Sequence, residues 1–328
     1  MRSVGRVVIE GLSIAMGSIL DKRLVWITGK GGVGKSTVAA ALGMAGARRG
    51  KRTIVCEVGA QERLSRLFRR QGVAGDETLL TDELWATSID PQAALREWLG
   101  TQVGGTLARA LNSASAFQYF VAAAPGAKEL VTVTKVWELG QSSRWKRSAR
   151  GYDLVVVDAP ASGHGVSMLR TPKTFADLAR IGPIHKQADL VWKSLRDRRN
   201  TGYVAVALPE EMPVTETLEL DRTLADQVGR RLDVVVVNGV YPRRFNGAEL
   251  DSIRASAGNG RSRATIGALR AAGVEAERHR TQQSEVGRLR RRLRGSGDAT
   301  VVTLPYLFEP EIELEGVDRL GRELERKL

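Results

Sequence analysis

The sequence predicts an α/β fold with a doubly wound, mostly parallel sheet and a helical insertion. Three observations predict it: a glycine-rich turn between an apolar run and a helical stretch, several further apolar runs rich in β-branched residues, and a carboxylate where one of those runs ends. Apolar runs without alternation are typical of parallel strands that helices cover on both faces. Ligands of such sheets bind at the carboxyl ends of the strands, so we expect a site there.

The expected elements alternate along the chain. The first unit is a strand at 24–28, followed by a helix at about 35–49 that ends at Gly50. The other expected strands are Thr53–Glu57, Leu154–Asp158, Tyr203–Leu208, Val234–Asn238 and Val301–Leu304. Helical patterns occupy about 81–145 and a second segment at about 170–200. No linker divides the 328 residues, so we expect one domain over 1–328 that carries a helical insertion.

The composition is that of a globular protein, with 42% hydrophobic and 27% charged residues. The apolar stretch from Val7 to Leu20 contains Glu10 and is too short to span a bilayer, which needs about 20 residues. We therefore expect no transmembrane segment, no signal peptide and a cytoplasmic location. Cys56 is the sole cysteine, which excludes a disulfide or a CxxC zinc site within the chain.

The formal net charge of +13 raises the question of an anionic partner. The most basic stretch has five arginines between Arg288 and Arg294. Because Val286, Leu289 and Leu293 follow a helical spacing, the preferred interpretation is a solvated helix face with a narrow apolar stripe. Contact with phosphates or with a membrane surface is the alternative interpretation.

A phosphate-binding loop is the most specific motif. It reads Gly29, Lys30, Gly31, Gly32, Val33, Gly34, Lys35, Ser36 and Thr37. The pattern GxxxxGK[ST] lies here between an expected strand and an expected helix, which is the context it requires. Glycines let backbone N–H groups surround the β-phosphate, Lys35 neutralises the β and γ oxygens, and the Ser36 hydroxyl completes the shell of a Mg²⁺ ion. The motif therefore predicts binding of ATP with Mg²⁺.

A second strand-to-loop motif has a carboxylate at the end of the strand. It reads YDLVVVDAPASGHG, with Asp158 as the last strand residue. A carboxylate in this position holds Mg²⁺ through water, and the N–H of Gly163 is placed to sense the γ-phosphate. His164 is a poor candidate for a general base, because positioning dominates phosphoryl transfer.

These motifs resemble those of the ArsA and Get family of dimeric ATPases. Lys30, directly after the first glycine, is typical of the deviant Walker A loop, and the DAPxSGH order of the second motif separates this family from the ParA and MinD type. The resemblance implies a dimer with ATP between the subunits and a Lys30 that reaches the partner's nucleotide. Two further segments are similar to family motifs, PGAKE at Pro125–Glu129 and PEEMPVTET at Pro209–Thr217.

The resemblance also implies contacts to the nucleotide base. Asn238 ends an expected strand, as does the asparagine that hydrogen-bonds adenine in relatives, and an amide offers both a donor and an acceptor. Pro305 and Tyr306 resemble the loop that packs on the base. The family similarity covers roughly 25–316.

The sequence departs from the family at the loop called switch I. In relatives an aspartate after the second strand positions the attacking water, whereas matching by chain position puts Gly59 there. Glu57, the loop around Gln61 and Glu62, and a partner subunit are the open candidates for this task, and we assign Glu57 to the catalytic set with Lys30 and Lys35. Loss of a water-orienting group commonly costs on the order of a hundredfold in rate. We therefore expect tight ATP binding and slow hydrolysis.

Three function classes follow. The preferred one is a dimeric ATPase that acts as a nucleotide-driven switch, whose insertion at about 101–140 opens or closes on an unknown cargo. Gly59, and the resemblance to actinobacterial pairs of diverged chains, favour instead a non-catalytic subunit of a heterodimer. A ParA- or MinD-like positioning ATPase is the third class, but the second motif argues against it and against a nucleic-acid partner. The single cysteine argues against cysteine-bound arsenite and against a zinc clasp.

Overall fold

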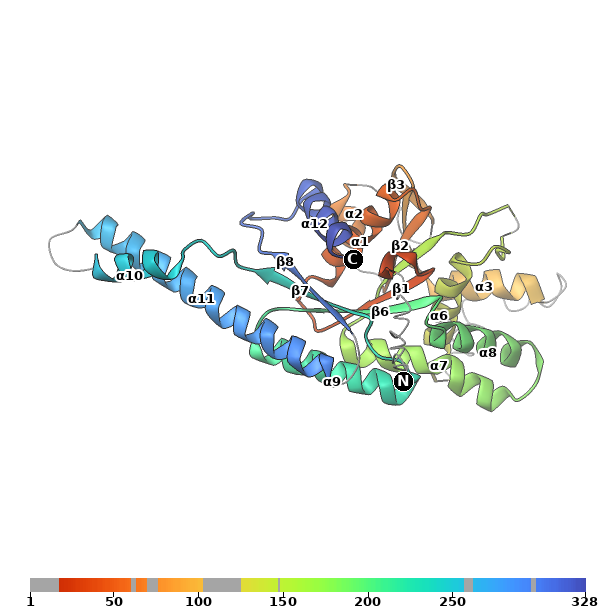
Figure 1. The fold of residues 1–328 in the computed structure, drawn as a ribbon. Coiled ribbons are helices and arrows are strands. Elements are labelled where there is room, and N and C mark those ends of the chain that lie inside the picture. Colours follow the sequence, from red (N-terminus) through yellow and green to blue (C-terminus); the bar gives the residue numbers. More distant parts are fainter. Residues whose placement is uncertain are drawn as a thin grey trace, which may run out of the picture.

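The computed structural model describes residues 18–59, 63–69, 76–102, 125–146, 148–256, 262–295 and 299–328. Eight strands of these residues form one sheet in the order β3-β4-β2-β5-β1-β6-β7-β8 (Figure 1). Neighbouring strands are parallel except for β3 and β4. The predicted α/β fold with a mostly parallel sheet is therefore confirmed.

The six strands expected from the sequence are all present, with small shifts of their ends. The strands are β1 (Leu24–Thr28), β2 (Thr53–Val58), β3 (Thr78–Thr81), β4 (Leu84–Ile89), β5 (Leu154–Asp158), β6 (Thr201–Ala207), β7 (Val234–Val240) and β8 (Thr300–Pro305). The strands β3 and β4 were not expected, because they lie where the sequence predicts the start of the helical insertion. Every residue of β4 except Trp85 is buried, so β4 shows neither alternation nor a helical stripe.

Helices cover both faces of the sheet. They are α1 (Lys35–Arg48), α2 (Arg63–Leu67), α3 (Pro91–Gln102), α6 (Ala127–Leu139), α7 (Ser162–Ala179), α8 (Gly182–Arg196), α9 (Glu211–Val228), α10 (Gly247–Ala255), α11 (Arg263–Arg294) and α12 (Leu314–Lys327), with a 3-10 turn at Ile19–Asp21. On one face, Val25 and Ile27 of β1 pack in a core with α1 and α12. On the other, Leu24 and Trp26 pack with α6, α7, α8, α9 and α11. Alternate residues of one strand thus serve two cores.

The helices that the structure describes within the expected insertion are α3 and α6, which follow β4. These two helices pack on each other, and α6 also packs on α7 and α8. The second helical segment expected at about 170–200 corresponds to the second half of α7 and to α8. The expected helical residues Leu107, Leu111, Phe117, Phe120 and Val121 lie outside the described residues.

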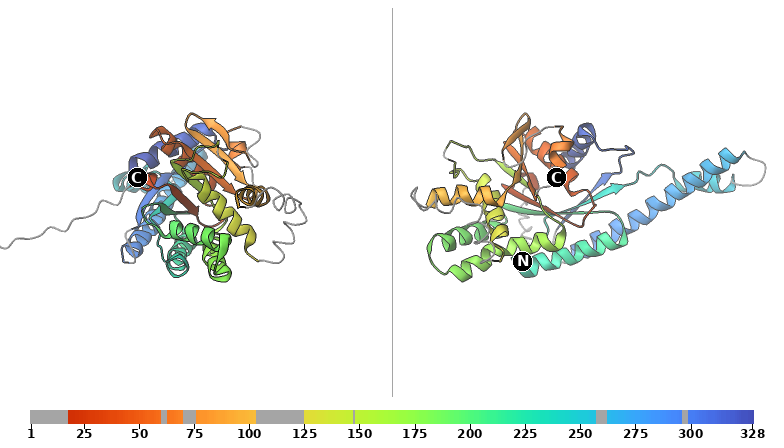
Figure 2. Two further views of the ribbon diagram at one scale, coloured as in Figure 1. Left: turned by 90° about the vertical axis from the view of Figure 1, so that its right-hand side faces the viewer. Right: turned by 180° about the vertical axis from the view of Figure 1, so that it is seen from behind.

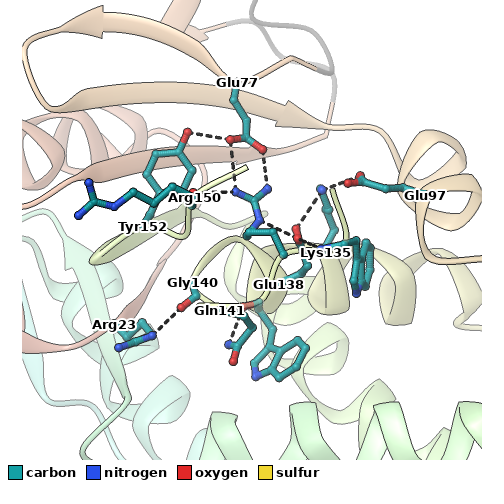
Figure 3. A network of polar contacts seen from close by, with 12 residues as sticks. Arg23, Glu77, Glu97, Lys135, Glu138, Gly140, Gln141, Arg150 and Tyr152 are labelled. Atoms are coloured by element: carbon teal, nitrogen blue, oxygen red, sulfur yellow. Dashed lines mark hydrogen bonds and ion pairs between the residues drawn. The ribbon is translucent and has the colours of Figure 1, made fainter. Parts of the chain in front are cut away.

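A buried polar network joins α6 to the edge of the sheet (Figure 3). The fully buried guanidinium of Arg144 donates to Glu77 and Glu138, each at 2.6 Å. The hydroxyl of Tyr152 donates to Glu77 at 2.8 Å, and Lys135 pairs with Glu138 at 3.0 Å. Burial alone would raise the pKa of Glu77, but the hydrogen bonds and charge of Arg144 lower it on balance. Because these buried charges pair with one another, the network fixes α6 against the segment that leads into β3.

Helices α10 and α11 form an arm that extends beyond the rest of the chain (Figures 1 and 2). The last turns of α11 bury Val286, Leu289 and Leu293, which confirms the apolar stripe. Arg288 of the basic run donates to the carbonyl of Glu211 and so braces α9. The other arginines of the run lie on the exposed side of the helix. Among the described helices, none is long and apolar enough to cross a membrane.

Candidate nucleotide site

The phosphate-binding loop lies at the carboxyl end of β1 and leads into α1. Two of its glycines have conformations and surroundings that exclude a side chain. Gly29 has a φ of +142° and a Cβ there would collide with the carbonyl of Val206. Gly34 has a φ of +92°, and a Cβ there would collide with the amide nitrogen of Asn238. The sequence folds into this loop because only glycine fits at both positions.

Lys35 is the first residue of α1, and only 7% of its surface is exposed. Its Nζ donates a hydrogen bond to the carbonyl of Lys30 at 2.9 Å, across the loop. Burial lowers the pKa of Lys35, while the nearby carboxylate of Asp158 opposes that shift. A buried cation at the start of a helix, where N–H groups lack partners, is suited to the β and γ oxygens of a nucleotide.

Ser36 and Asp158 meet at the end of the loop where the sequence predicts a Mg²⁺ ion. The Ser36 hydroxyl donates to Oδ2 of Asp158 at 2.5 Å, and Asp158 is the last residue of β5, which pairs with β1. Burial raises the pKa of Asp158, opposed by the Ser36 hydrogen bond and by Lys35. The hydroxyl of Thr28 is buried at the end of β1 and, among the residues that the structure describes, has no hydrogen-bond partner.

A hydroxyl and a carboxylate are the hard oxygen donors that Mg²⁺ takes together with water and phosphate. These side chains therefore fit the ion, and Ser36 and Asp158 would hold it. In the part of the chain that the structure describes, there is no group of three or more His, Cys, Asp or Glu side chains that could hold a metal.

At switch I, the carboxylate at the end of β2 makes contacts that differ from those of Asp158. Glu57 lies opposite Asp158 in the pairing of β2 with β5 and is 2% exposed. Its Oε1 accepts hydrogen bonds from the N–H groups of Arg63 and Leu64 at 2.8 and 3.0 Å, which caps α2, whereas Oε2 is buried and has no partner among the described residues. Burial raises the pKa of Glu57, although the two backbone hydrogen bonds oppose the shift. The role of Glu57 in orienting water stays a prediction, and Gln61 and Glu62 lie outside the described residues.

Arg63 is a neighbour of the site that the sequence interpretation missed. Its Nη1 donates to the Ser36 hydroxyl at 3.2 Å. The sole sequence signal was a cation four residues after Gly59, and such a signal is too weak to assign a role. The structure thus brings a second cation to the metal-binding end of the loop.

Lys30, the residue directly after the first glycine of the loop, contacts helix α9. Its Nζ forms an ion pair at 2.6 Å with Oε1 of Glu216, and 49% of the Lys30 side chain is exposed. Glu216 belongs to α9 and to the PEEMPVTET segment. The segment that the sequence singled out as family-like therefore lies directly beside this lysine.

The residues expected at the base lie at the ends of β7 and β8. The Asn238 amide donates to the carbonyl of Val33 at 3.0 Å, so it touches the phosphate-binding loop directly. Pro305 ends β8, and the N–H of Tyr306 donates to the carbonyl of Val240. The ring of Tyr306 stacks on Tyr241 at 4.8 Å between centroids. The structure thus brings Asn238, Pro305 and Tyr306 to the same edge of the sheet.

The second strand-to-loop motif, which we call switch II, leads from β5 into helix α7, which begins at Ser162. Gly163 lies in the first turn, where N–H groups have no partner within the helix. His164 is 62% exposed at its side chain and lies 3.8 Å from Glu129 of α6. A cavity of about 480 Å³ opens between the two switches and the insertion; its lining includes Gly59, His164, Lys128 and Glu129. Switch I, switch II and α6 therefore share one space.

A glycine loop before α1, a buried lysine and an aspartate at the end of the neighbouring parallel strand define the class of P-loop NTPases. Comparison with known proteins narrows this class. Residues 22–189 match the model of the family described as anion-transporting ATPases, the ArsA ATPases. The chain belongs to this family.

Individual relatives agree with this family. The chain is 33% identical to ATPase BagA of Mycobacterium tuberculosis over 234 residues, which are 70% of this chain and 68% of BagA. It is 28% identical to ATPase ARSA1 of Chlamydomonas reinhardtii over 195 residues, which are 51% of this chain and 25% of ARSA1. The resemblance stated from the motifs is therefore confirmed at the level of the family.

Proposed function

We propose that this chain binds MgATP and works as a dimeric, nucleotide-driven switch with slow hydrolysis. The observation that carries the proposal is the meeting of Lys35, Ser36 and Asp158 around the glycine loop, with Ser36 and Asp158 2.5 Å apart. In this role Lys35 binds the β and γ oxygens, Ser36 and Asp158 hold Mg²⁺, and Asn238, Pro305 and Tyr306 contact the base. Gly29 to Thr37 surround the phosphates with backbone N–H groups.

Dimer formation is supported by the position of Lys30. The lysine has half of its side chain exposed and is held by an ion pair with Glu216, and an exposed ion pair is worth at most about 1 kcal/mol. A contact of that strength is easily exchanged for a contact with a phosphate in a partner subunit. The proposed partner is a second copy or a paralogous ArsA-like chain.

Slow hydrolysis is supported by switch I. Gly59 offers no side chain, and one oxygen of Glu57 is already used by two backbone N–H groups of α2. Neither residue presents a free carboxylate oxygen to bulk solvent near the γ-phosphate position, since Glu57 is 2% exposed. Without such a group, water is not oriented and the rate falls on the order of a hundredfold.

A switching role is supported by the shared cavity. A change in Gly163 at the start of α7, or in the loop at Gly59, alters a space that is also lined by Lys128 and Glu129 of α6. Because Arg144 anchors α6 to the sheet edge, movement of switch II would shift α7 relative to a fixed α6. We propose that this relative movement changes the surface that the insertion, as part of a single domain, presents to a cargo.

Titration calorimetry with the full chain tests the binding proposal. We expect uptake of ATP in the presence of Mg²⁺ and much weaker uptake in EDTA, because Ser36 and Asp158 need the ion. Light scattering should give twice the chain mass with a non-hydrolysable ATP analogue and a lower mass with ADP. Absence of Mg²⁺-dependent uptake would contradict the whole proposal, whereas uptake without a change in mass would contradict the dimeric switch alone.

The second candidate function is a nucleotide-regulated subunit without hydrolysis, and Gly59 is the observation that favours it. Measuring hydrolysis by the purified chain, alone and with a paralogous chain, separates the two candidates. Turnover by this chain's own site would support the ATPase. Complete absence of turnover in both samples, with MgATP bound, would support the regulatory subunit.

A further inference from the structure

Arg63 brings to the site a positive charge that the proposed function does not use. It opens α2, directly after the switch I segment. Two features hold α2 in place: Oε1 of Glu57 caps its first N–H groups, and Leu64 is fully buried in the core beside α1. The Cα of Arg63 is therefore anchored to the protein core, while its side chain is exposed.

The guanidinium reaches the end of the site where the γ-phosphate must lie. Its Nη1 is 3.2 Å from the Ser36 hydroxyl, which in turn is 2.5 Å from Asp158. Lys35, on the same side of the loop, is adjacent to Ser36 in the sequence. The pKa values of Lys35 and Asp158 are both affected by the charge of Arg63. Arg63 thus acts electrostatically on the two groups that define the phosphate end.

We propose that Arg63 is a catalytic arginine, supplied by the chain itself, that binds the γ-phosphate oxygens of ATP during hydrolysis. The inference rests on the proposed ATPase function. In the reaction the oxygen of water bonds to the γ-phosphorus, the bond from that phosphorus to the β,γ-bridging oxygen breaks, and a proton of the water passes to the released phosphate. Arg63 stays protonated and donates N–H bonds to the oxygens that carry the developing charge.

This role explains how switch I can contribute although it has Gly59. Arginine stabilises charge without orienting water, and its planar guanidinium matches two phosphate oxygens at once. A site with an arginine and without a water-orienting carboxylate would bind the transferred phosphoryl group well and still turn over slowly. The alternative is a structural arginine that only braces the Ser36 hydroxyl.

Arg66 is the matched control, because it lies on the same short helix and is exposed. The variants Arg63→Ala, Arg63→Lys and Arg66→Ala would be made in the full chain. Retention of fluorescent ADP with Mg²⁺ would be measured with and without aluminium fluoride, which mimics the γ-phosphate in transfer. The thermal midpoint of each variant shows whether it is folded, and Arg63→Lys keeps a charge at the position if Arg63→Ala does not fold.

We expect aluminium fluoride to tighten ADP binding by the unchanged chain and by Arg66→Ala, since transition-state analogues bind at least about a hundredfold more tightly than ground-state ligands. Arg63→Ala should lose about tenfold to a hundredfold of that tightening, while its affinity for ADP alone stays close to that of the unchanged chain. Arg63→Lys should lie between. Equal tightening in all variants, or an equal loss for ADP with and without aluminium fluoride, would overturn the inference. Failure of the unchanged chain to bind ADP would instead contradict the proposed function.

Discussion

The carboxyl ends of β1 and β5 differ sharply from the carboxyl end of the adjacent strand β2. At the first pair, Lys35, Ser36 and Asp158 lie together around a loop that only glycine can form. At β2, the carboxylate of Glu57 turns inward to cap α2, and Gly59 follows without a side chain. We infer from this difference that holding a triphosphate and activating water are separate tasks in this fold. We propose that this chain performs the first task and has lost the group for the second.

The largest effect is expected from a change at Lys35, which tests the proposed nucleotide-binding role of the loop. Replacing it with alanine removes the buried cation, and hydrogen bonds to charged groups are worth about 1.5 to 3 kcal/mol each. We expect the Kd for MgATP to rise about a hundredfold or more, measured by calorimetry. The control is Lys173→Ala, since Lys173 pairs with Asp177 on the exposed side of α7. Unchanged affinity for MgATP in Lys35→Ala would contradict the claim that the residues at the ends of β1 and β5 bind the nucleotide.

The variant Gly59→Asp tests the claim that switch I lacks a group that orients water. A carboxylate at this position should raise hydrolysis about tenfold to a hundredfold, because it restores a group that can orient water. A Cβ at Gly59 meets no described atom within 4 Å, although the φ of +99° is unfavourable for any side chain. Gly59→Asn imposes a similar backbone demand without the negative charge, so it should leave the rate unchanged. Equal rates in the two variants would show that switch I is not what limits turnover.

Two variants of Glu57 show whether this residue acts as a helix cap or as a catalytic carboxylate. Glu57→Ala removes the acceptor for the N–H groups of Arg63 and Leu64, and loss of a cap costs about 1 kcal/mol. Glu57→Gln keeps an oxygen at the cap and removes the charge. We expect the thermal midpoint to fall in the alanine variant alone, and hydrolysis to fall with it. If glutamine lowers hydrolysis as far as alanine while the thermal midpoint is kept, the carboxylate itself acts on water.

The smallest effect is expected at the ion pair of Lys30 with Glu216. Releasing Lys30 through Glu216→Gln should strengthen dimer formation with an ATP analogue by no more than about fivefold, because exposed ion pairs contribute at most about 1 kcal/mol. Lys30→Ala should abolish the dimer and leave MgATP binding nearly unchanged. Glu219→Gln, on the same helix, is the control. A dimer that forms equally well with Lys30→Ala would contradict the role of this lysine.

Most of the fold and the phosphate end of the site could be predicted from the sequence. Every residue of β5, Leu154–Asp158, is buried. Because a buried strand is rich in apolar, β-branched residues, its sequence LVVVD could be recognised as a strand without knowledge of the neighbouring strands. The contact between Ser36 and Asp158 follows from two local motifs, because the carboxyl ends of parallel strands meet at the same edge of a sheet. Such features are predictable because each is signalled by a motif whose own residues are close together in the chain.

Other features depended on contacts that local patterns do not contain. Strand β4 was missed because it is buried on both faces and next to helical segments. The ion pair of Lys30 with Glu216 joins residues 186 positions apart, and neither side chain signals the other. The contact of Arg63 with Ser36 depends on the position of α2, which the cap by Glu57 and the burial of Leu64 hold in place. These contacts join segments that are far apart in the chain, so local patterns in one sequence do not reveal them.

A single-turnover assay tests the central claim most directly. Labelled ATP would be mixed with an excess of the full chain and Mg²⁺, so that one experiment measures both the fraction of ATP bound and the rate of its hydrolysis. We predict nearly complete binding followed by hydrolysis at least about a hundredfold slower than the enzyme median of about 10 per second. Hydrolysis near that median, or no binding of ATP, would contradict the separation of the two tasks.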